Sequence, residues 1–472
     1  MAMRKWRVAA VVGLMSTLLP LVHGAQPAIA LSCATGGACK LGDMGPKGGV
    51  VFYTASTPQW WGQYMESFSD LNATMRNALP VGQAWLAPRV IYQGDDAKAR
   101  RVEAKRIGAG AENYVSIYGQ TPYSLLPFGL SGWSATYQLF YPSKDELDAL
   151  YNYIVTTDSP LDTAFRTGVV GDPYWTSTEA SDTFAWYQLF NDGTQFTDAN
   201  GIVNGLAGNK TLTKSSMHKG SAFPSKTMRH LFIGAWAPSG AVLPPKPPRP
   251  VIPPGGRTSA DCAAGRSCQV GDIGPGGGVV FYDAGKTESW GRYLEASPAS
   301  CQKSGLTWRS ALPGKRGTRQ LPLLYPTWAT AARQRVESKR LGMGKANTEL
   351  VVKQHVVKQH KVLPQASLDT TAAGYADSLV CGGKDDWFLP SKDELDTLYN
   401  VLAVTDNDLT GNNSFEFTRG FYWTSSEYNN ETAWTQLWID GQQFDREKWM
   451  SGDKRRDGGF NPFHVRPIRA FG

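Results

Sequence analysis

Apolar residues recur along this chain with two periods, and the whole pattern occurs twice. Leu147, Leu150 and Tyr151 are spaced i, i+3, i+4, which predicts a helix with one buried face. Runs rich in Val, Phe and Tyr predict β-strands, one at 50–53 and its second copy at 279–282. The chain is therefore predicted to contain two copies of one α+β unit, built from short helices and antiparallel hairpins.

The predicted helix begins with Pro-Ser-Lys-Asp-Glu-Leu in both copies, at 142–147 and 390–395. Ser143 and Glu146 have the S-x-x-E spacing of a capping box, in which each side chain bonds a free amide of the first turn. Acidic residues in that turn also favour the helix dipole. We interpret the acids as part of a scaffold helix and predict no catalytic residue.

A hairpin follows each helix. Residues 185–190 and 433–438 contain alternating side chains, and glycine-containing turns come next. Trp186 and Trp434 occur in both copies, so we expect them in the core. Trp438-Ile439-Asp440 resembles the Trp-Asn-Asp calcium motif of C-type lectins, but the sequence has no Glu-Pro-Asn partner, so we prefer a turn.

A charged run, Arg-Val-Glu-x-Lys-Arg, also occurs twice, at 101–106 and 335–340. Gly108 and Gly342 follow it, which predicts short helices that end at a glycine. We expect the charges to form a solvated helix face.

The ends of the two copies define the predicted domains. Arg4, Lys5 and Arg7 precede an apolar run and small residues at 28–30, the layout of a secretory signal peptide. The predicted organisation is a signal peptide at 1–30, repeat 1 at 31–236, a proline-rich linker at 237–261 and repeat 2 at 262–472. A proline-rich linker is expected to act as a semi-rigid spacer.

Charge and hydropathy restrict the partners. The chain has 472 residues and a formal charge of +7, of which the predicted signal peptide contains three cations. The remaining charge is weak and dispersed, which argues against nucleic acid. No other segment is long and apolar enough to span a bilayer. We expect a secreted or cell-surface protein, or a periplasmic one in a Gram-negative source.

Six cysteines in an exported chain predict disulfides. Cys33 and Cys39 in repeat 1 match Cys262 and Cys268 in repeat 2. The other two occur only in repeat 2, as expected of a bonded pair, so we predict Cys301–Cys381. No C-x-x-C motif or neighbouring histidine favours a metal site.

The copies differ most after the hairpin, where repeat 2 is basic. Positive residues with an exposed tryptophan suit an anionic sugar, by ion pairing and ring stacking; a solvated basic loop is the alternative. The candidate ligand-binding residues are Trp438, Asp440, Arg446, Lys448, Trp449, Lys454, Arg455, Arg456 and Arg466.

The strongest motifs lie in repeat 2, at 271–278, 387–395, 422–427 and 465–471. They resemble the C-terminal domain family of the Lcl collagen-like adhesin, formerly a domain of unknown function. The resemblance implies a bacterial surface or secreted protein, a C-type-lectin-like α+β fold and, in some members, glycan-dependent adhesion. Repeat 1 departs from the family because Leu231 and Gly234 replace the two arginines of the final strand.

The leading functional hypothesis is thus a non-enzymatic module that binds a glycan or polysaccharide without a cofactor; calcium is an alternative that no motif supports. A second hypothesis is an enzyme, since formylglycine-generating oxidases share a related fold, but those need a redox cysteine pair. The third is a purely structural envelope protein.

Overall fold

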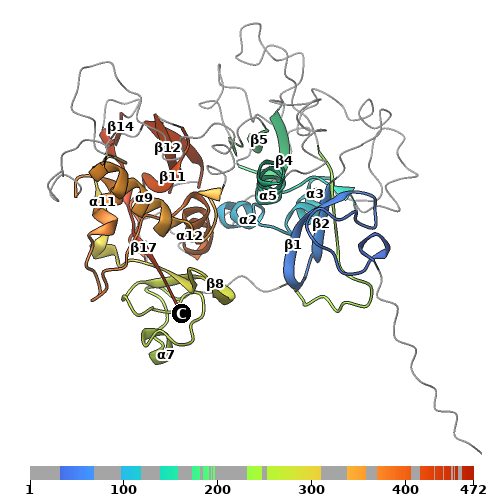
Figure 1. The fold of residues 1–472 in the computed structure, drawn as a ribbon, viewed down its shortest axis with the longest axis horizontal. Helices are drawn as coiled ribbons and strands as arrows, with labels where there is room; N and C mark the ends of the chain where they lie inside the picture. Colours follow the sequence, from blue (N-terminus) through green and yellow to red (C-terminus); the bar gives the residue numbers. More distant parts are fainter. Residues whose placement is uncertain are drawn as a thin grey trace, which may run out of the picture.

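The structure is a computed structural model of the chain. The residues that it describes are 32–67, 97–118, 139–157, 173–180, 184–190, 193, 195–196, 231–246, 252–309, 337–357, 369–405, 415–429, 431–438, 441–447, 450, 452–454 and 460–472. They form short helices and mainly antiparallel sheets, which agrees with the predicted α+β class (Figure 1).

Repeat 1 contains a sheet in the order β1-β2-β7-β3 and a second one in the order β4-β5-β6. Its elements are η1 (Cys33–Thr35), β1 (Val50–Gln59), β2 (Gly62–Ser67), α2 (Ala97–Glu103), α3 (Gly110–Tyr118), β3 (Leu139–Phe140), α5 (Lys144–Thr156), β4 (Pro173–Glu179), β5 (Ala185–Leu189), β6 (Gln195–Phe196) and β7 (Ile233–Trp236).

Repeat 2 follows the same order with additions. Its sheets run β17-β9-β8 and β10-β16-β11-β12-β13, and β14 pairs with β15. Its elements, with the short helix before it, are α7 (Ala260–Ala263), β8 (Val279–Glu288), β9 (Gly291–Ala296), η3 (Ala299–Cys301), β10 (Lys303–Ser304), α9 (Gly344–Val357), α11 (Ala372–Asp377), α12 (Lys392–Thr405), β11 (Phe421–Glu427), β12 (Thr432–Leu437), β13 (Gln443–Glu447), β14 (Gly452–Lys454), β15 (Phe460–Pro462), β16 (His464–Val465) and β17 (Ile468–Phe471).

The predicted capped helix and core positions are confirmed, whereas of the charged runs only 101–103 lies in a described helix and residues 338–340 form a turn. Helix α5 begins with a complete capping box, and Leu147, Leu150 and Tyr151 are buried. Trp186 and Trp434 are 1% and 0% exposed, as expected of core residues. The structure also contains the three predicted disulfides, Cys33–Cys39, Cys262–Cys268 and Cys301–Cys381.

Each repeat buries one glutamate under its glycine-rich turn, and the two repeats place different cations near that glutamate. Glu295 in repeat 2 lies 3.2 Å from Nη1 of Arg469. In repeat 1 Gly234 replaces that arginine, and a Cβ on Gly234 would lie 3.1 Å from Nζ of Lys47. Burial raises the pKa of Glu66 to about 7, while Lys47 acts to lower it. Lys47 therefore supplies a positive charge near Glu66 where repeat 2 has the arginine, and its Nζ donates to the carbonyl of Ala235 at 3.4 Å.

The presence of a lysine in repeat 1 instead of an arginine depends on a third position. Gly276 is the counterpart of Lys47, and a Cβ there would lie 2.7 Å from the ring of Trp387. Leu139 occupies the position of Trp387 in repeat 1 and leaves room for the lysine. The loss of arginine from the last strand of repeat 1 is thus accompanied by a lysine that interacts electrostatically with the buried glutamate.

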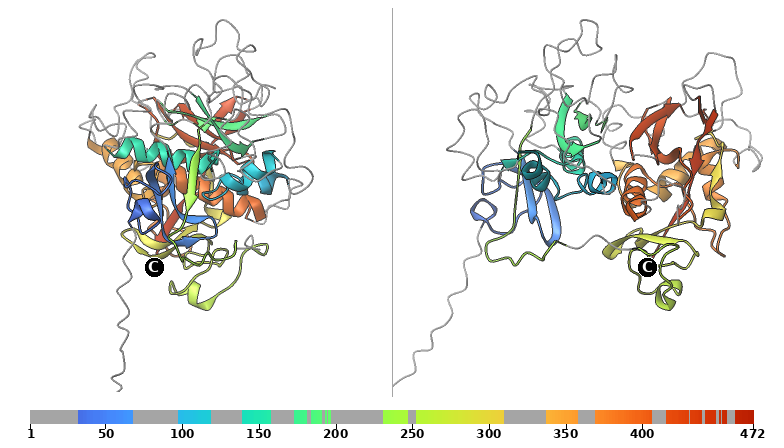
Figure 2. Two further views of the ribbon diagram at one scale, coloured as in Figure 1. Left: turned by 90° about the vertical axis from the view of Figure 1, so that its right-hand side faces the viewer. Right: turned by 180° about the vertical axis from the view of Figure 1, so that it is seen from behind.

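The two repeats lie side by side, and α2 of repeat 1 packs against α12 of repeat 2 (Figures 1 and 2). Val102 of α2 belongs to the same apolar cluster as Leu398 and Leu402 of α12. The described ends of the linker also lie against the repeats, since Lys246 pairs with Glu112. The described residues thus form a contact between the repeats in addition to the apolar clusters within each repeat.

The interpretation of the charged runs as solvated faces is wrong for their lysines. Lys105 and Lys339 are each 2% exposed. Helix α2 ends at Glu103, so Lys105 lies in the turn before Gly108 rather than on a helix. Both lysines are buried because the other repeat covers them, which a local sequence pattern does not reveal.

Candidate binding site between the two repeats

Two of the candidate ligand-binding residues are packed inside repeat 2. Trp438 is 6% exposed and stacks on Phe417, with ring centroids 3.8 Å apart. Arg466 is 3% exposed, and its Nη2 donates to the carbonyl of Phe415 at 3.0 Å. Burial of these side chains does not favour direct contact with a ligand.

Arg446 is partly exposed, and of Lys454 only the backbone is described. The guanidinium of Arg446 lies over the rings of Phe421 and Phe444, at 4.7 and 4.8 Å. The backbone of Lys454 is in β14. The remaining candidates lie outside the described residues, and they are Asp440, Lys448, Trp449, Arg455 and Arg456.

The capping glutamates position the start of the twin helices α5 and α12. Oε2 of Glu146 accepts from the amide of Ser143 at 2.7 Å, and its Oε1 accepts from Gly108 at 2.8 Å. Glu394 makes the same bonds in repeat 2. Burial raises the pKa of both glutamates to about 7. Each cap thereby ties its helix to the charged turn that contains Lys105 or Lys339.

The twin helices meet at the boundary between the repeats. Nζ of Lys144 lies 3.4 Å from Oδ1 of Asp145 in its own repeat and 3.4 Å from Oδ2 of Asp396 in the other. Asp396 also accepts from Nε2 of Gln436 at 2.6 Å. The ion pair joins residues 252 positions apart, so it depends on how the repeats pack.

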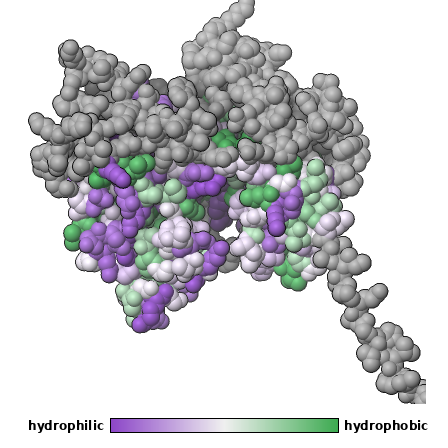
Figure 3. All heavy atoms as spheres, viewed as in Figure 1, coloured by the Kyte–Doolittle hydropathy of each residue, from purple (hydrophilic) through white to green (hydrophobic). Residues whose placement is uncertain are grey.

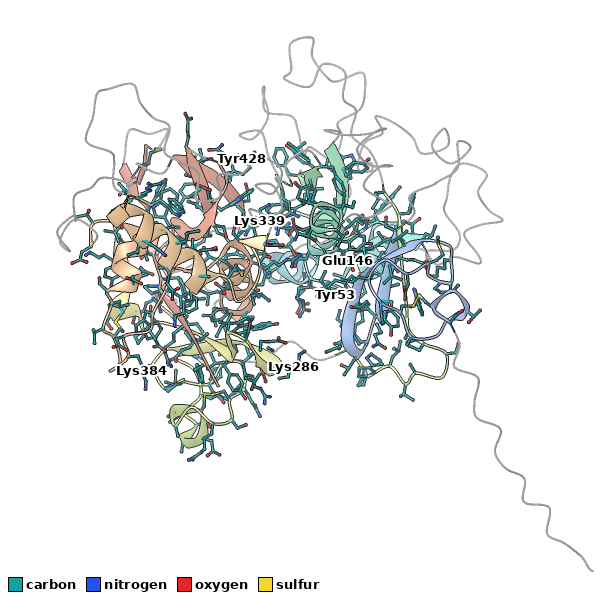
Figure 4. The ribbon with its side chains drawn as sticks, in the orientation of Figure 1. Tyr53, Glu146, Lys286, Lys339, Lys384 and Tyr428 are labelled. Atoms are coloured by element: carbon teal, nitrogen blue, oxygen red, sulfur yellow. A yellow bond between two sulfur atoms is a disulfide. The ribbon has the colours of Figure 1, made fainter. Side chains whose placement is uncertain are left out.

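The buried lysines of the charged turns extend this contact. Nζ of Lys105 lies 5.2 Å from the ring of Trp186 in its own repeat and 5.1 Å from that of Tyr399 in the other. Lys339 repeats the arrangement at 5.4 and 5.7 Å from its own and the opposite ring. Figure 4 marks Lys339 in the region where the repeats meet.

Each repeat contributes two lysines and two aspartates to this contact, so the formal charges balance. We call this group the interface cluster; its members are Lys105, Lys144, Asp145, Asp148, Lys339, Lys392, Asp393 and Asp396. A balanced set of opposite charges reduces the desolvation cost that unpaired buried charges would carry.

The aspartates of the interface cluster differ in their acidity. Burial raises the pKa of Asp145 to about 6, although Lys144 acts in the opposite direction. Burial likewise raises the pKa of Asp393 to about 7, against the effect of Lys392. For Asp396, burial acts upward, but Lys144, Lys105 and Lys392 outweigh it and lower the pKa. About a quarter of the Asp145 side chain (26%) is exposed, so water moderates its shift.

A cavity of about 400 Å³ opens beside the interface cluster and is bordered by both repeats. Tyr53, Asn152 and Ile107 line it from repeat 1, and Arg340 and Asn400 line it from repeat 2. In Figure 3 a hollow at the boundary between the repeats is flanked by hydrophilic residues. The cavity has the size and the location, between two domains, that are typical of small-ligand sites.

Metal chemistry has weak support among the described residues. The one group of His, Cys, Asp or Glu close enough to hold an ion there is Cys33, Cys39 and Asp43. Both sulfurs are joined in a disulfide, so neither is available as a thiolate ligand.

Comparisons with protein families, with curated proteins and with solved structures found no match for this chain. Among the described residues, no helix has the length and apolar character needed to cross a bilayer.

The sequence contained one signal for this site. Lys105, Lys144 and Asp148 all have identical counterparts in repeat 2, yet the capping box requires only the serine and the glutamate. Residues retained in both copies without a local role were therefore candidates for the contact between the copies. Tyr53 also has an identical counterpart, Tyr282, but only the packing of the repeats places Tyr53 at the cavity.

Proposed function

We propose that this protein is an exported, non-enzymatic glycan-binding protein with two C-type-lectin-like repeats, and that the ligand binds in the cavity between them. The cavity of about 400 Å³ is the observation that supports this proposal. A sugar presents many hydroxyl groups and an apolar ring face, so its site needs polar side chains close to an aromatic one.

The wall of the cavity offers these groups. Asp145, Asp393 and Thr397 are partly exposed along it, and Tyr53 is a half-buried aromatic side chain. Arg340 is exposed at the same cavity and suits a carboxylate or sulfate group of an anionic sugar. Lys144 and Lys392, the lysines that line the cavity, are only 2% and 1% exposed, so Arg340 supplies the accessible positive charge.

The carboxylates of the interface cluster bear on whether the site binds or hydrolyses a sugar. A glycosidase needs one carboxyl group that gives a proton and another that attacks or activates water. Here Lys144 lies 3.4 Å from the carboxylates of both Asp145 and Asp396. Lys144, Lys105 and Lys392 lower the pKa of Asp396, which opposes a proton-donor role for that residue, whereas burial raises the pKa of Asp145 to about 6. A test for hydrolysis therefore belongs with the binding assay.

A glycan array with the full exported chain tests the proposal, because the chain supplies its own matched controls. Tyr53→Ala and Arg340→Ala should each weaken binding at least tenfold. Their counterparts Tyr282 and Arg106 do not line this cavity, so Tyr282→Ala and Arg106→Ala should leave binding unchanged. Stability of every variant is checked by urea unfolding.

Two results would contradict the cavity as the site. Binding that survives Tyr53→Ala and Arg340→Ala but is lost with Trp449→Ala and Arg455→Ala would assign the glycan to the basic loop of repeat 2. Release of reducing sugar from a bound glycan would assign an enzymatic function instead.

A further inference from the structure

The last part of the linker covers the glycine-rich turn of repeat 2. The amide of Arg257 donates to the carbonyl of Gly271 at 2.8 Å, and the amide of Ile273 donates to the carbonyl of Arg257 at 2.8 Å. Nε of Arg257 also donates to Oδ1 of Asp272 at 3.0 Å. The linker thus pairs with the edge of the turn as a short parallel strand and adds an ion pair.

Two further linker residues pack closely against the glycine-rich turn of repeat 2. Ile252 is 6% exposed and packs against Gly271, where a Cβ would lie 3.0 Å from its side chain. Gly256 has φ +84°, and a Cβ there would lie 2.6 Å from Cδ1 of Ile273. The covering segment therefore needs a branched apolar residue, then three residues, a glycine and an arginine.

The same turn in repeat 1, residues 41–44, is uncovered, and we call it the open turn. Leu41 and Met44 are 53% and 54% exposed. Among the residues that the structure describes, none donates to the carbonyl of Gly42 and none accepts from the amide of Met44. These are the two backbone groups that correspond to those bonded by the linker in repeat 2.

The carboxylate of the open turn is also more accessible than its counterpart. Asp272 is 6% exposed beneath the linker. Asp43 is partly exposed, and its Oδ2 accepts from the amide of Lys40 at 2.8 Å. A guanidinium could therefore approach Asp43 from solvent.

The chain's own upstream residues do not suit this surface. The positions that correspond to Ile252 and Arg257 are His23 and Ala28, counted from the first cysteine of each repeat. Both lie in the predicted signal peptide, whose cleavage would remove them. The apolar-x-x-x-Gly-Arg pattern occurs once in this chain, at 252–257, where repeat 2 already holds it.

We propose that the open turn is a docking site for an extended segment of a partner protein, one that carries a branched apolar residue followed four and five positions later by glycine and arginine. The segment adds a short parallel strand to the turn, places its apolar side chain beside Leu41 and pairs its arginine with Asp43. Main-chain pairing supplies affinity in this mode, and the side chains supply specificity.

A synthetic peptide with the sequence of residues 250–258, Pro-Val-Ile-Pro-Pro-Gly-Gly-Arg-Thr, tests the proposal with the full exported chain by fluorescence anisotropy. Saturable binding is expected. It should weaken at least tenfold with Arg257→Ala in the peptide, and equally with Asp43→Asn or Leu41→Ser in the chain. Both chain positions are solvent-accessible, so these variants should fold. Asp261→Asn, an exposed acid in an unrelated ion pair, should bind the peptide normally.

Absence of saturable binding would overturn the proposal, as would equal affinity in Asp43→Asn and the unaltered chain. A concentration-dependent dimer that Asp43→Asn abolishes would assign the surface to a second copy and refute the claim of a separate partner. Tyr53→Ala should leave peptide binding unchanged. Failure of the docking proposal can therefore be distinguished from failure of the glycan proposal.

Discussion

The two repeats place different cations near their buried glutamates, and substitutions that give repeat 1 the arginine of repeat 2 test how much these cations stabilise the fold. Lys47→Gly in repeat 1 removes the cation near Glu66, which is 0% exposed and also accepts from the amide of Gly49 at 2.9 Å. Gly234→Arg adds the cation that repeat 2 carries at Arg469. The double variant therefore gives repeat 1 the lysine-free, arginine-containing arrangement of repeat 2.

The magnitude follows from the burial of the glutamate. Hydrogen bonds to charged groups contribute about 1.5–3 kcal/mol, and a charge interaction without a hydrogen bond contributes less. Lys47→Gly should thus lower the free energy of unfolding by about 1 kcal/mol. Gly234→Arg alone should also destabilise repeat 1, because a Cβ there would already lie 3.1 Å from Nζ of Lys47.

Urea unfolding of the four proteins provides the assay. A pH of 7.5 is suitable because the pKa of Glu66 is about 7 and that of Lys47 about 8, so both ionised forms are present. The double variant should be more stable than the sum of the single changes predicts, with a coupling energy of about 2 kcal/mol. Additive effects of Lys47→Gly and Gly234→Arg would show that the two cations do not substitute for each other.

Three further predictions concern stability. Because the two interface aspartates with raised pKa values bind protons more tightly when folded, their contribution to stability should be present at acidic pH and lost as the pH rises through about 6–7. Stability should therefore fall from pH 5.5 to 8, by about 1–2 kcal/mol from these two aspartates after a discount for exposure, and further from Glu66, Glu146 and Glu394, whose pKa values are also raised to about 7; a urea midpoint that rises over this range contradicts the assignment. Replacing Cys301 and Cys381 by serine opens a loop with a separation of 80 residues and should cost about 4 kcal/mol of unfolding free energy; a loss below about 1 kcal/mol, measured by urea unfolding, would show that the bond contributes little. Gly108→Ala, at φ +89° with its Cβ 2.0 Å from Trp61, should cost about 2–4 kcal/mol, whereas Gly240→Ala, at φ +83° in open space, should cost about 1 kcal/mol; equal losses in thermal unfolding would contradict the packing argument.

The sequence predicted features that depend on neighbouring residues or on comparison of the two copies. The capping box of Ser143 and Glu146 requires residues three positions apart, so its spacing is readable in one dimension. The pair Cys301–Cys381 was predicted because both cysteines are missing from repeat 1. The tryptophans at 186 and 434 were assigned to the core because both copies retain them.

Features that depend on burial by distant residues were missed. Trp438 and Arg466 were chosen as ligand contacts for their chemistry, but Phe417 and Phe415 pack around them inside repeat 2. Lys105 was expected in solvent, but the ring of Tyr399 from the other repeat covers it. Residue type alone does not determine exposure.

The sequence by itself showed that the chain is duplicated, and it predicted export, three disulfides and a capped helix in each repeat. Only the tertiary structure placed Lys144 beside Asp396 and opened a cavity next to them. It also left the turn at 41–44 open while covering its counterpart. The physical reason is that local propensity acts between near neighbours, whereas burial and charge pairing depend on surfaces that meet after folding.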